Sequence, residues 1–206
     1  MRGIGGVLPG DRGIVFAASF MRAVANGLIG VLAGIYLAEL GFDPAAWGAV
    51  LGAGIAGTAA GAAGVMFWGD RIGRKRWLVA LGVLGAAGGI VFAFSSQIAV
   101  LGAAAFLGML NSLGKDRAAA LAIEQAILPS TGGDAERTRA FAWYNVIQDV
   151  GHALGAALAV LPLFLREFAG VNPLDSLRAA VILYAVLYAG CVLSLATAAF
   201  ESRDFK

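Results

Sequence analysis

The feature that most constrains the fold is a series of apolar segments, each about as long as a lipid bilayer is thick. Residues 45–68 hold no charged side chain, and neither do residues 77–95. A helix needs about 20 mostly apolar residues to cross the hydrocarbon core of a membrane. Charged residues make up only 14% of the chain, whereas soluble domains hold roughly 25%. The sequence therefore predicts an integral membrane protein.

Six such segments follow one another, and each is long enough to cross a bilayer as a helix. They are predicted at about 13–40, 45–68, 77–95, 97–128, 140–165 and 179–200. Turn-forming sequences separate them, and Asp43 with Pro44 gives the second segment a cap and a proline at its first position. The prediction is an all-α membrane protein with one six-helix transmembrane domain over residues 1–206.

The basic residues outside the segments are divided unequally between the two sides of the membrane. On the side opposite the N-terminus there are only Arg166 and Arg178. The side of the N-terminus holds Arg2, Arg12, Arg71, Arg74, Lys75, Arg76, Arg137, Arg139, Arg203 and Lys206. Because short cytoplasmic loops carry an excess of lysine and arginine, both termini are predicted to be cytoplasmic.

The basic connection between the second and third segments is GDRIGRKR, at residues 69–76. Its residue pattern is more specific than a cytoplasmic loop needs for membrane topology alone. It resembles the loop between the second and third helices of the major facilitator superfamily: a glycine, three residues, Asp, Arg, any residue, Gly and two basic residues. The leading glycine is replaced by Met66. The matching residues are Asp70, Arg71, Gly73, Arg74 and Lys75. Residues 122–128 and 137–158 also resemble the fourth and fifth helices of bacterial permeases in that superfamily.

The resemblance covers the whole chain but only the N-terminal half of a twelve-helix transporter. It implies a half bundle made of two three-helix repeats, with both termini in the cytoplasm. It also implies that Asp70, Arg71, Gly73, Arg74 and Lys75 form a cytoplasmic gate, which latches this half to another half. The membrane implied is the inner membrane of a bacterium or archaeon.

Ionisable residues inside the predicted spans are the candidates for function. Each costs about 2.5 to 3.5 kcal/mol or more in the membrane unless it is paired or hydrated. They are Arg22, Lys115, Asp116, Arg117, Glu124, Asp149 and His152. Glu124 lies near the cytoplasmic end of its segment, where we expect it to pair with a loop arginine. A lone histidine such as His152 is more often simply hydrogen-bonded than a proton relay.

Three of these charges are predicted to lie at the same depth. Arg22, Arg117 and Asp149 fall about 12 to 16 Å from the cytoplasmic ends of their helices, as the lining of a water-filled cavity would require. Helical spacing places Asn26 beside Arg22, and Asn145 and His152 beside Asp149. The predicted solute or ion pathway consists of Arg22, Asn26, Lys115, Asp116, Arg117, Asn145, Asp149 and His152. The alternative is a structural ion pair such as Arg22 with Asp149. Lys115, Asp116 and Arg117 are consecutive, so they cannot all face one cavity.

The sequence favours transport of a small solute by alternating access. Two copies forming a parallel homodimer would supply both halves, with proton coupling as one option. Intramembrane cations favour an anionic or zwitterionic solute. The alternatives are one half of a heteromeric or split permease, and a non-transporting membrane scaffold. The sequence contains no zinc-protease, serine-hydrolase or Walker motif. We therefore expect no enzyme activity, cofactor, metal or nucleic-acid partner.

Overall fold

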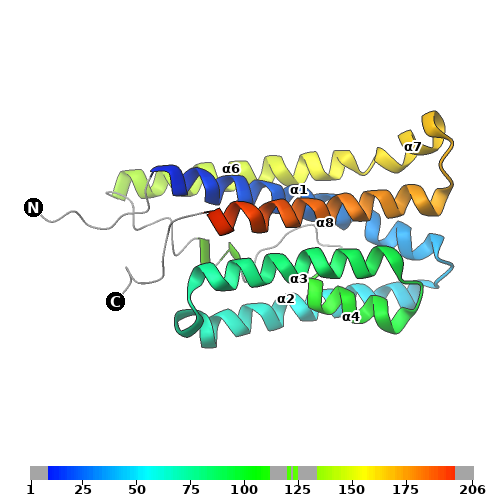
Figure 1. Cartoon of the computed structure of the whole chain (residues 1–206), viewed down its shortest axis with the longest axis horizontal. Coiled ribbons are helices and arrows are strands. Elements are labelled where there is room, and N and C mark those ends of the chain that lie inside the picture. Colours follow the sequence, from blue (N-terminus) through cyan, green and yellow to red (C-terminus); the bar gives the residue numbers. More distant parts are fainter. Residues whose placement is uncertain (1–8, 112–119, 122, 125–133, 198–206) are drawn as a thin grey trace, which may run out of the picture.

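A computed structural model describes residues 9–111, 120–121, 123–124 and 134–197. Its long helices run side by side along one axis (Figure 1). They are α1 (Pro9–Glu39), α2 (Pro44–Ile72), α3 (Arg74–Phe94), α4 (Ile98–Gly108), α6 (Asp134–Leu158), α7 (Leu161–Ala169) and α8 (Pro173–Thr197). Five helical stretches in this part of the chain are long and apolar enough to cross a membrane. The predicted all-α membrane fold is confirmed.

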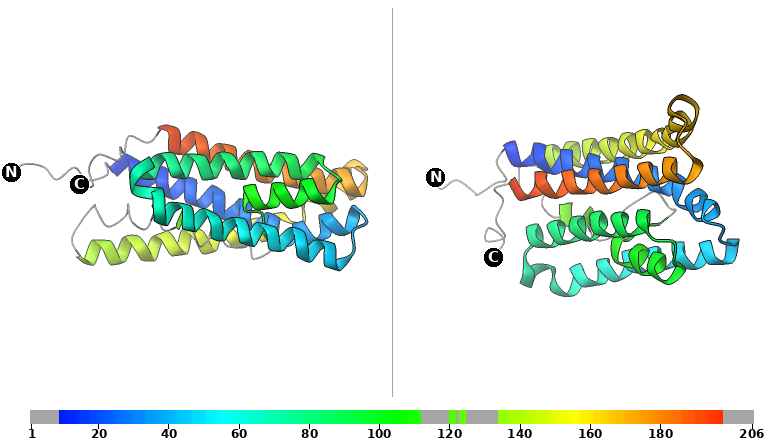
Figure 2. Two further views of the ribbon diagram at one scale, coloured as in Figure 1. Left: turned by 90° about the horizontal axis from the view of Figure 1, so that it is seen from below. Right: turned by 45° about the vertical axis from the view of Figure 1, so that its right-hand side comes forward.

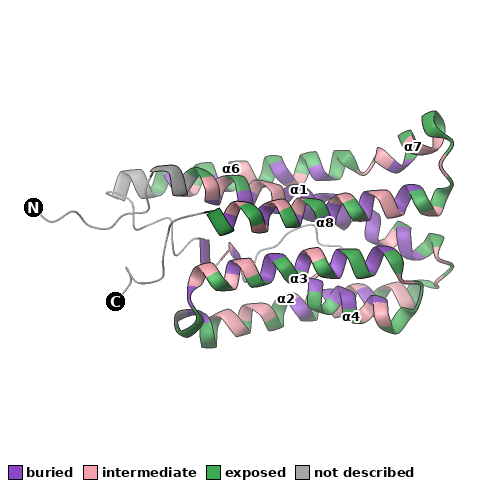
Figure 3. Ribbon diagram, in the orientation of Figure 1, coloured by how far each residue is buried: buried purple, intermediate pink, exposed green. Residues whose placement is uncertain are grey.

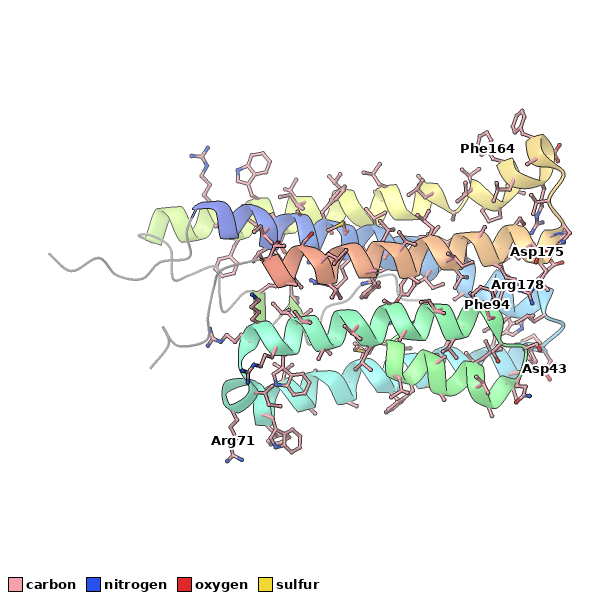
Figure 4. All side chains as sticks on the ribbon, in the orientation of Figure 1. Asp43, Arg71, Phe94, Phe164, Asp175 and Arg178 are labelled. Carbon is pink, nitrogen blue, oxygen red and sulfur yellow. The ribbon has the colours of Figure 1, made fainter. Side chains whose placement is uncertain are left out.

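The helix ends divide between the two ends of the bundle as the sequence predicts. α1 begins and α8 ends where α2 connects to α3, at the end that carries Arg71 (Figures 1 and 4). Asp43, Asp175 and Arg178 lie at the opposite end (Figure 4). Asp43 accepts a hydrogen bond from the amide N of Ala46 at 2.8 Å, which confirms it as the N-cap of α2.

The helix contacts show an internal repeat of three spans. α1 packs against α6 and α8, while α4 packs against α2 and α3. If the first three spans are exchanged in order with the last three, α1 takes the place of α4, α2 of α6, and α3 of α8. The two contacts of α1 then become the two contacts of α4, and the α3–α8 contact is unchanged. The main contacts run from α6 through α1, α8, α3 and α4 to α2. This order forms an arc with α6 and α2 at its two ends, and both lie on the side away from α3 and α8 (Figure 2).

Small residues let the helices of this arc approach closely. Gly85 and Gly89 of α3 lie against the rings of Tyr188 and Tyr184, where an added Cβ would come within 2.5 and 2.7 Å of ring carbons. Gly155 of α6 lies against the backbone of α1. Membrane helices associate through such small-residue contacts because their apolar surfaces gain little by leaving lipid.

We predict that Gly155→Ala destabilises the protein by about 1 to 3 kcal/mol, because the new methyl group overpacks the contact between α1 and α6. An added Cβ would lie 2.0 Å from the backbone O of Val24. The control is Gly34→Ala, whose Cβ would meet nothing within 4 Å and whose helix gains about 1 kcal/mol from the better propensity of alanine. Thermal unfolding of both variants in one detergent should lower the midpoint for Gly155→Ala alone. Equal midpoints would contradict the close packing.

Two of the predicted helices are wrong as continuous helices. The fourth was expected over 97–128, but α4 ends at Gly108 and Met109 takes a left-handed conformation with φ 56°. The fifth was expected over 140–165, but it divides into α6 and α7. Pro162 lies at the first turn of α7 and lacks the N–H that would continue the helix from α6.

The predicted basic loop is also shorter than expected. α2 continues to Ile72 and α3 begins at Arg74, so only Gly73 separates them. Gly73 has φ 97°, a conformation that costs glycine far less than other residues. Asp70 therefore lies in the last turn of α2 and not in a loop.

Candidate functional site

Among the residues that the structure describes, the most buried charges form an ion pair in the interior of the bundle. Arg22 of α1 is 4% exposed and Glu124 is 0% exposed. Nη1 and Nη2 of Arg22 donate to the two carboxylate oxygens of Glu124 at 2.8 and 2.6 Å. A bidentate pair of this kind is among the stronger polar contacts in proteins. Together the two residues carry no net charge into the membrane.

Three further side chains complete a network around Glu124. The hydroxyl of Tyr144 on α6 donates to Glu124 Oε2. Gln148, one turn along the same helix, donates to the hydroxyl oxygen of Tyr144 at 2.6 Å and to Ser19 Oγ of α1 at 3.0 Å. The network therefore ties α1 to α6 and to the segment that carries Glu124.

The expected partner of Glu124 is wrong, and so is the ion pair of Arg22 with Asp149 that the sequence left as an alternative. Arg22 pairs with Glu124 and not with Asp149, and Glu124 pairs with a residue of α1 and not with a loop arginine. Asp149 lies five residues beyond Tyr144, about 140° around α6. When Tyr144 faces α1, Asp149 must point away from it. Arg22 and Asp149 therefore do not line one cavity together.

The outer surface of α6 has one polar and one apolar side. Asn145 and Asp149 are exposed, and His152 is half-buried beside them. On the other exposed side of the helix, the side chains are apolar: Trp143, Val146, Val150 and Leu154. The apolar side suits lipid. The polar side does not, because Asp149 lies about 16 Å beyond Thr138, where the apolar span of residues 138–169 begins.

Between positions 48 and 63, the exposed side of α2 is made almost entirely of small residues. Besides Ile55, its exposed residues between positions 48 and 63 are Gly48, Ala49, Gly52, Ala56, Ala59, Ala60 and Ala63. A Cβ added to Gly48 or Gly52 would meet nothing within 4 Å. Few residues are buried along both end helices (Figure 3). In the apolar part of each span, 17% of the residues are buried in α2 and in residues 138–169, against 61% in α1. We call the Asn145–Asp149 side of α6 and the glycine–alanine side of α2 the open face.

The sequence profile of the Major Facilitator Superfamily matches residues 15–205. The chain belongs to the major facilitator superfamily. Its fold is similar to that in the crystal structure of the human organic anion transporter MFSD10 (TETRAN), with a TM-score of 0.59 and 17% sequence identity. The match covers 94% of this chain and 48% of that one, so the chain spans about half the length of the solved transporter. No curated protein sequence matches it.

Membership of the major facilitator superfamily confirms the family predicted from residues 69–76. The chain is an integral membrane protein of a family of transporters and not of enzymes. The open face comprises the sides of α6 and α2 that nothing else in the described bundle covers.

The residues predicted to form a cytoplasmic gate lie at the end of the bundle that carries the α2–α3 connection. Arg71 is exposed and projects from that end (Figure 4). Lys75 Nζ donates to the backbone O of Ala196 at 3.1 Å, so it helps to cap α8 within the same chain. Arg74 is the first residue of α3 and half-buried. The side chain of Asp70 is outside the described part of the structure.

The remaining pathway candidates divide into two groups. Asn26 lies inside the bundle, 8% exposed, and accepts a hydrogen bond from the Tyr188 hydroxyl at 3.0 Å. Lys115, Asp116 and Arg117 lie outside the described residues. Where the structure describes the chain, no group of three or more His, Cys, Asp or Glu side chains could hold a metal ion.

Sequence reasoning missed the partners of the buried pair. Ser19, Tyr144 and Gln148 were not singled out, because neutral polar residues are common in membrane helices. Their spacing gives a signal: Ser19 lies three residues before Arg22, and Tyr144 lies four before Gln148. Residues spaced in this way share one side of a helix.

Proposed function

We propose that this chain transports a small solute by alternating access, as a parallel homodimer whose two copies take the places of the two halves of a full-length transporter. The observation that carries the proposal is the exposed carboxylate of Asp149, near the middle of a membrane span. Leaving an ionised group in lipid there costs about 2.5 to 3.5 kcal/mol or more. A second half covering the open face would turn this surface into a solvated cavity.

A second copy suits the open face because the two end helices complement each other. The halves of such transporters are related by an axis along the membrane normal. Such an axis sets α6 of one copy against α2 of the other, and repeats the contact on the opposite side. The glycine–alanine side of α2 allows a helix to approach closely, while the polar side of α6 stays at the wet centre.

Within this dimer we assign the coupling role to Asp149. A carboxylate beside a water-filled cavity can bind and release a proton, and two copies would bring two such groups to the axis. Asn145 and His152 lie beside Asp149 on α6 and belong to the same proposed pathway. Because Arg22 is neutralised by Glu124, the preference for an anionic or zwitterionic solute now rests on Lys115 and Arg117.

The gate is proposed to work between the copies. Asp70, at the end of α2, would face the start of the partner's α6, where unpaired N–H groups attract a carboxylate by about 0.3 to 1 kcal/mol. Arg71, Gly73, Arg74 and Lys75 shape this end of the half. A different six-helix half on the open face is the second candidate, and a scaffold without transport is the third.

We predict that Gly52→Leu weakens the dimer about 10-fold, equivalent to about 1.4 kcal/mol of association free energy. The added side chain holds the partner helix away from the small-residue side of α2. The matched control is Gly102→Leu on α4, since a Cβ at Gly102 also meets nothing within 4 Å but lies outside the open face. Subunit counting by single-molecule photobleaching in liposomes, over a range of protein-to-lipid ratios, measures the dimer fraction. A monomer at every ratio for the unmodified protein would remove the homodimer and leave the different-half reading.

A further inference from the structure

A small cavity lies inside the half bundle, apart from the open face. Its volume is about 20 Å³, and α1, α2, α3, α8 and the segment after α4 enclose it. Most of its lining is apolar, but polar side chains from four parts of the chain meet in it. These are Arg22, Asn26, Thr58, Asn111 and Tyr188.

One donor in the cavity lacks a hydrogen bond. Asn26 Oδ1 accepts from the Tyr188 hydroxyl at 3.0 Å, but Asn26 Nδ2 is inaccessible to solvent and has no hydrogen-bond partner. A buried unsatisfied donor costs about 1 to 3 kcal/mol. The side chain is 8% exposed, so bulk water does not satisfy it. An acceptor within the cavity would therefore satisfy the Asn26 Nδ2 donor.

The fourth span is interrupted beside the same cavity. α4 has only 11 residues, about 16 Å of helix, which is roughly half of a 30 Å hydrocarbon core. Its end is closed by the left-handed Met109 and by a hydrogen bond from Leu110 N to Ala105 O of 2.9 Å. Met109 and Asn111 both line the cavity. Backbone leaves the helical conformation inside a membrane only where it is buried in protein or faces water.

The charges around the cavity favour a neutral ligand. A cation would lie next to the Arg22 guanidinium, and none of the described lining residues is a carboxylate. An anion would meet the negative end of α4 and a guanidinium already neutralised by Glu124. Water has both donors and acceptors, and a cavity of about 10 to 15 Å³ or more, measured for a water-sized sphere, holds one molecule.

We propose that this cavity binds one water molecule, which accepts a hydrogen bond from Asn26 Nδ2 and bridges α1 to the interrupted fourth span. Asn111 Nδ2 already donates to Thr58 Oγ1 at 3.3 Å and to the backbone O of Met109 at 3.1 Å. The water thus extends an existing link between α2 and the helix break as far as α1. The inference does not depend on the proposed dimer.

The chain contains its own reporters for this water. Cys191 is 1% exposed, is the only cysteine in the sequence, and lines the cavity with Met109. Hydroxyl radicals formed by X-ray radiolysis oxidise a buried sulfur when a bound water lies beside it. Met21 packs near Gly190 and does not line the cavity, so its oxidation reports general opening of the bundle.

The test is radiolytic labelling in ¹⁸O-water of the unmodified protein and of two variants. Asn26→Leu takes up cavity volume and removes the unpaired donor, and should lower the ¹⁸O labelling of Cys191 at least about 5-fold, as expected when a bound water loses one typical hydrogen bond. Thr58→Val keeps the shape, removes one polar partner, and should lower labelling in the same direction. Met21 should not change.

Three results would overturn the proposal. An unmodified protein without ¹⁸O on Cys191 has a dry cavity. Unchanged Cys191 labelling in both variants means that water reaches the sulfur without these groups. If Met21 labelling rises in Asn26→Leu, the bundle of that variant has opened, and only Thr58→Val tests the proposal. Unchanged Cys191 labelling in Thr58→Val then overturns the proposal, and reduced labelling supports it.

Discussion

Replacing Glu124 with glutamine is expected to lower the free energy of unfolding by about 3 to 5 kcal/mol, because it removes the carboxylate that pairs with the buried guanidinium of Arg22. The arginine is 4% exposed, so bulk water does not take the place of the lost carboxylate. The amide also cannot accept from Nη1, Nη2 and the Tyr144 hydroxyl together as the carboxylate does. Thermal unfolding of the purified variant, followed by tryptophan fluorescence, measures the loss.

Two controls separate the buried charge from a general effect of mutation. Glu124→Gln combined with Arg22→Gln removes both charges and should regain part of the lost stability. Asp175→Asn breaks an exposed ion pair with Arg178, in which the atoms are 3.1 Å apart, and should leave the unfolding midpoint unchanged. A midpoint for Glu124→Gln equal to that of Asp175→Asn would contradict the structural role of the pair.

The membrane spans were predictable because hydrocarbon thickness fixes the length of an apolar helix. Asp43 and Pro44 marked the start of α2 for the same local reason that they cap it in the structure. The break at Met109 was not predictable from methionine itself, which favours helix, and the glycine and asparagine beside it at positions 108 and 111 are individually weak signals of a helix end. It depends on tertiary contacts: a Cβ added to Gly108 would come within 3.0 Å of Gly88 Cα.

The residues of the candidate site were easier to predict than their pairings. Helical spacing correctly placed Asn145 and Asp149 on one side of a helix. It could not show which side of α6 turns inward, and a rotation of about 140° decides whether Tyr144 or Asp149 faces the pair of Arg22 and Glu124. A carboxylate in a span is unusual in either case. Only packing distinguishes Glu124, which is enclosed by partners, from Asp149, which faces outward.

This difference gives the two carboxylates opposite expected roles. Glu124 is fully buried and holds α1 against α6 through Arg22 and Tyr144. Asp149 is exposed, and the described part of the chain gives it no ion-pair partner. Asp149→Asn should therefore leave the unfolding midpoint unchanged, where Glu124→Gln lowers it. A carboxylate that lies in a membrane span without a structural role is expected to act on solute or proton.

Asp149→Cys is expected to react about 100-fold faster than Val150→Cys with a cationic, membrane-impermeant methanethiosulfonate, because a charge costs about 2.5 to 3.5 kcal/mol to bring into hydrocarbon. Both positions are exposed in the single chain, and they differ by about 100° around α6. Both substitutions are made in a Cys191→Ala background and measured in liposomes. Fast labelling at position 149 alone places the polar side of α6 against water and the apolar side against lipid.

In the same liposomes, Asp149→Asn should abolish uptake of any solute that the unmodified protein accumulates. Equal labelling at the two positions, or full uptake by Asp149→Asn, would remove Asp149 from the transport pathway.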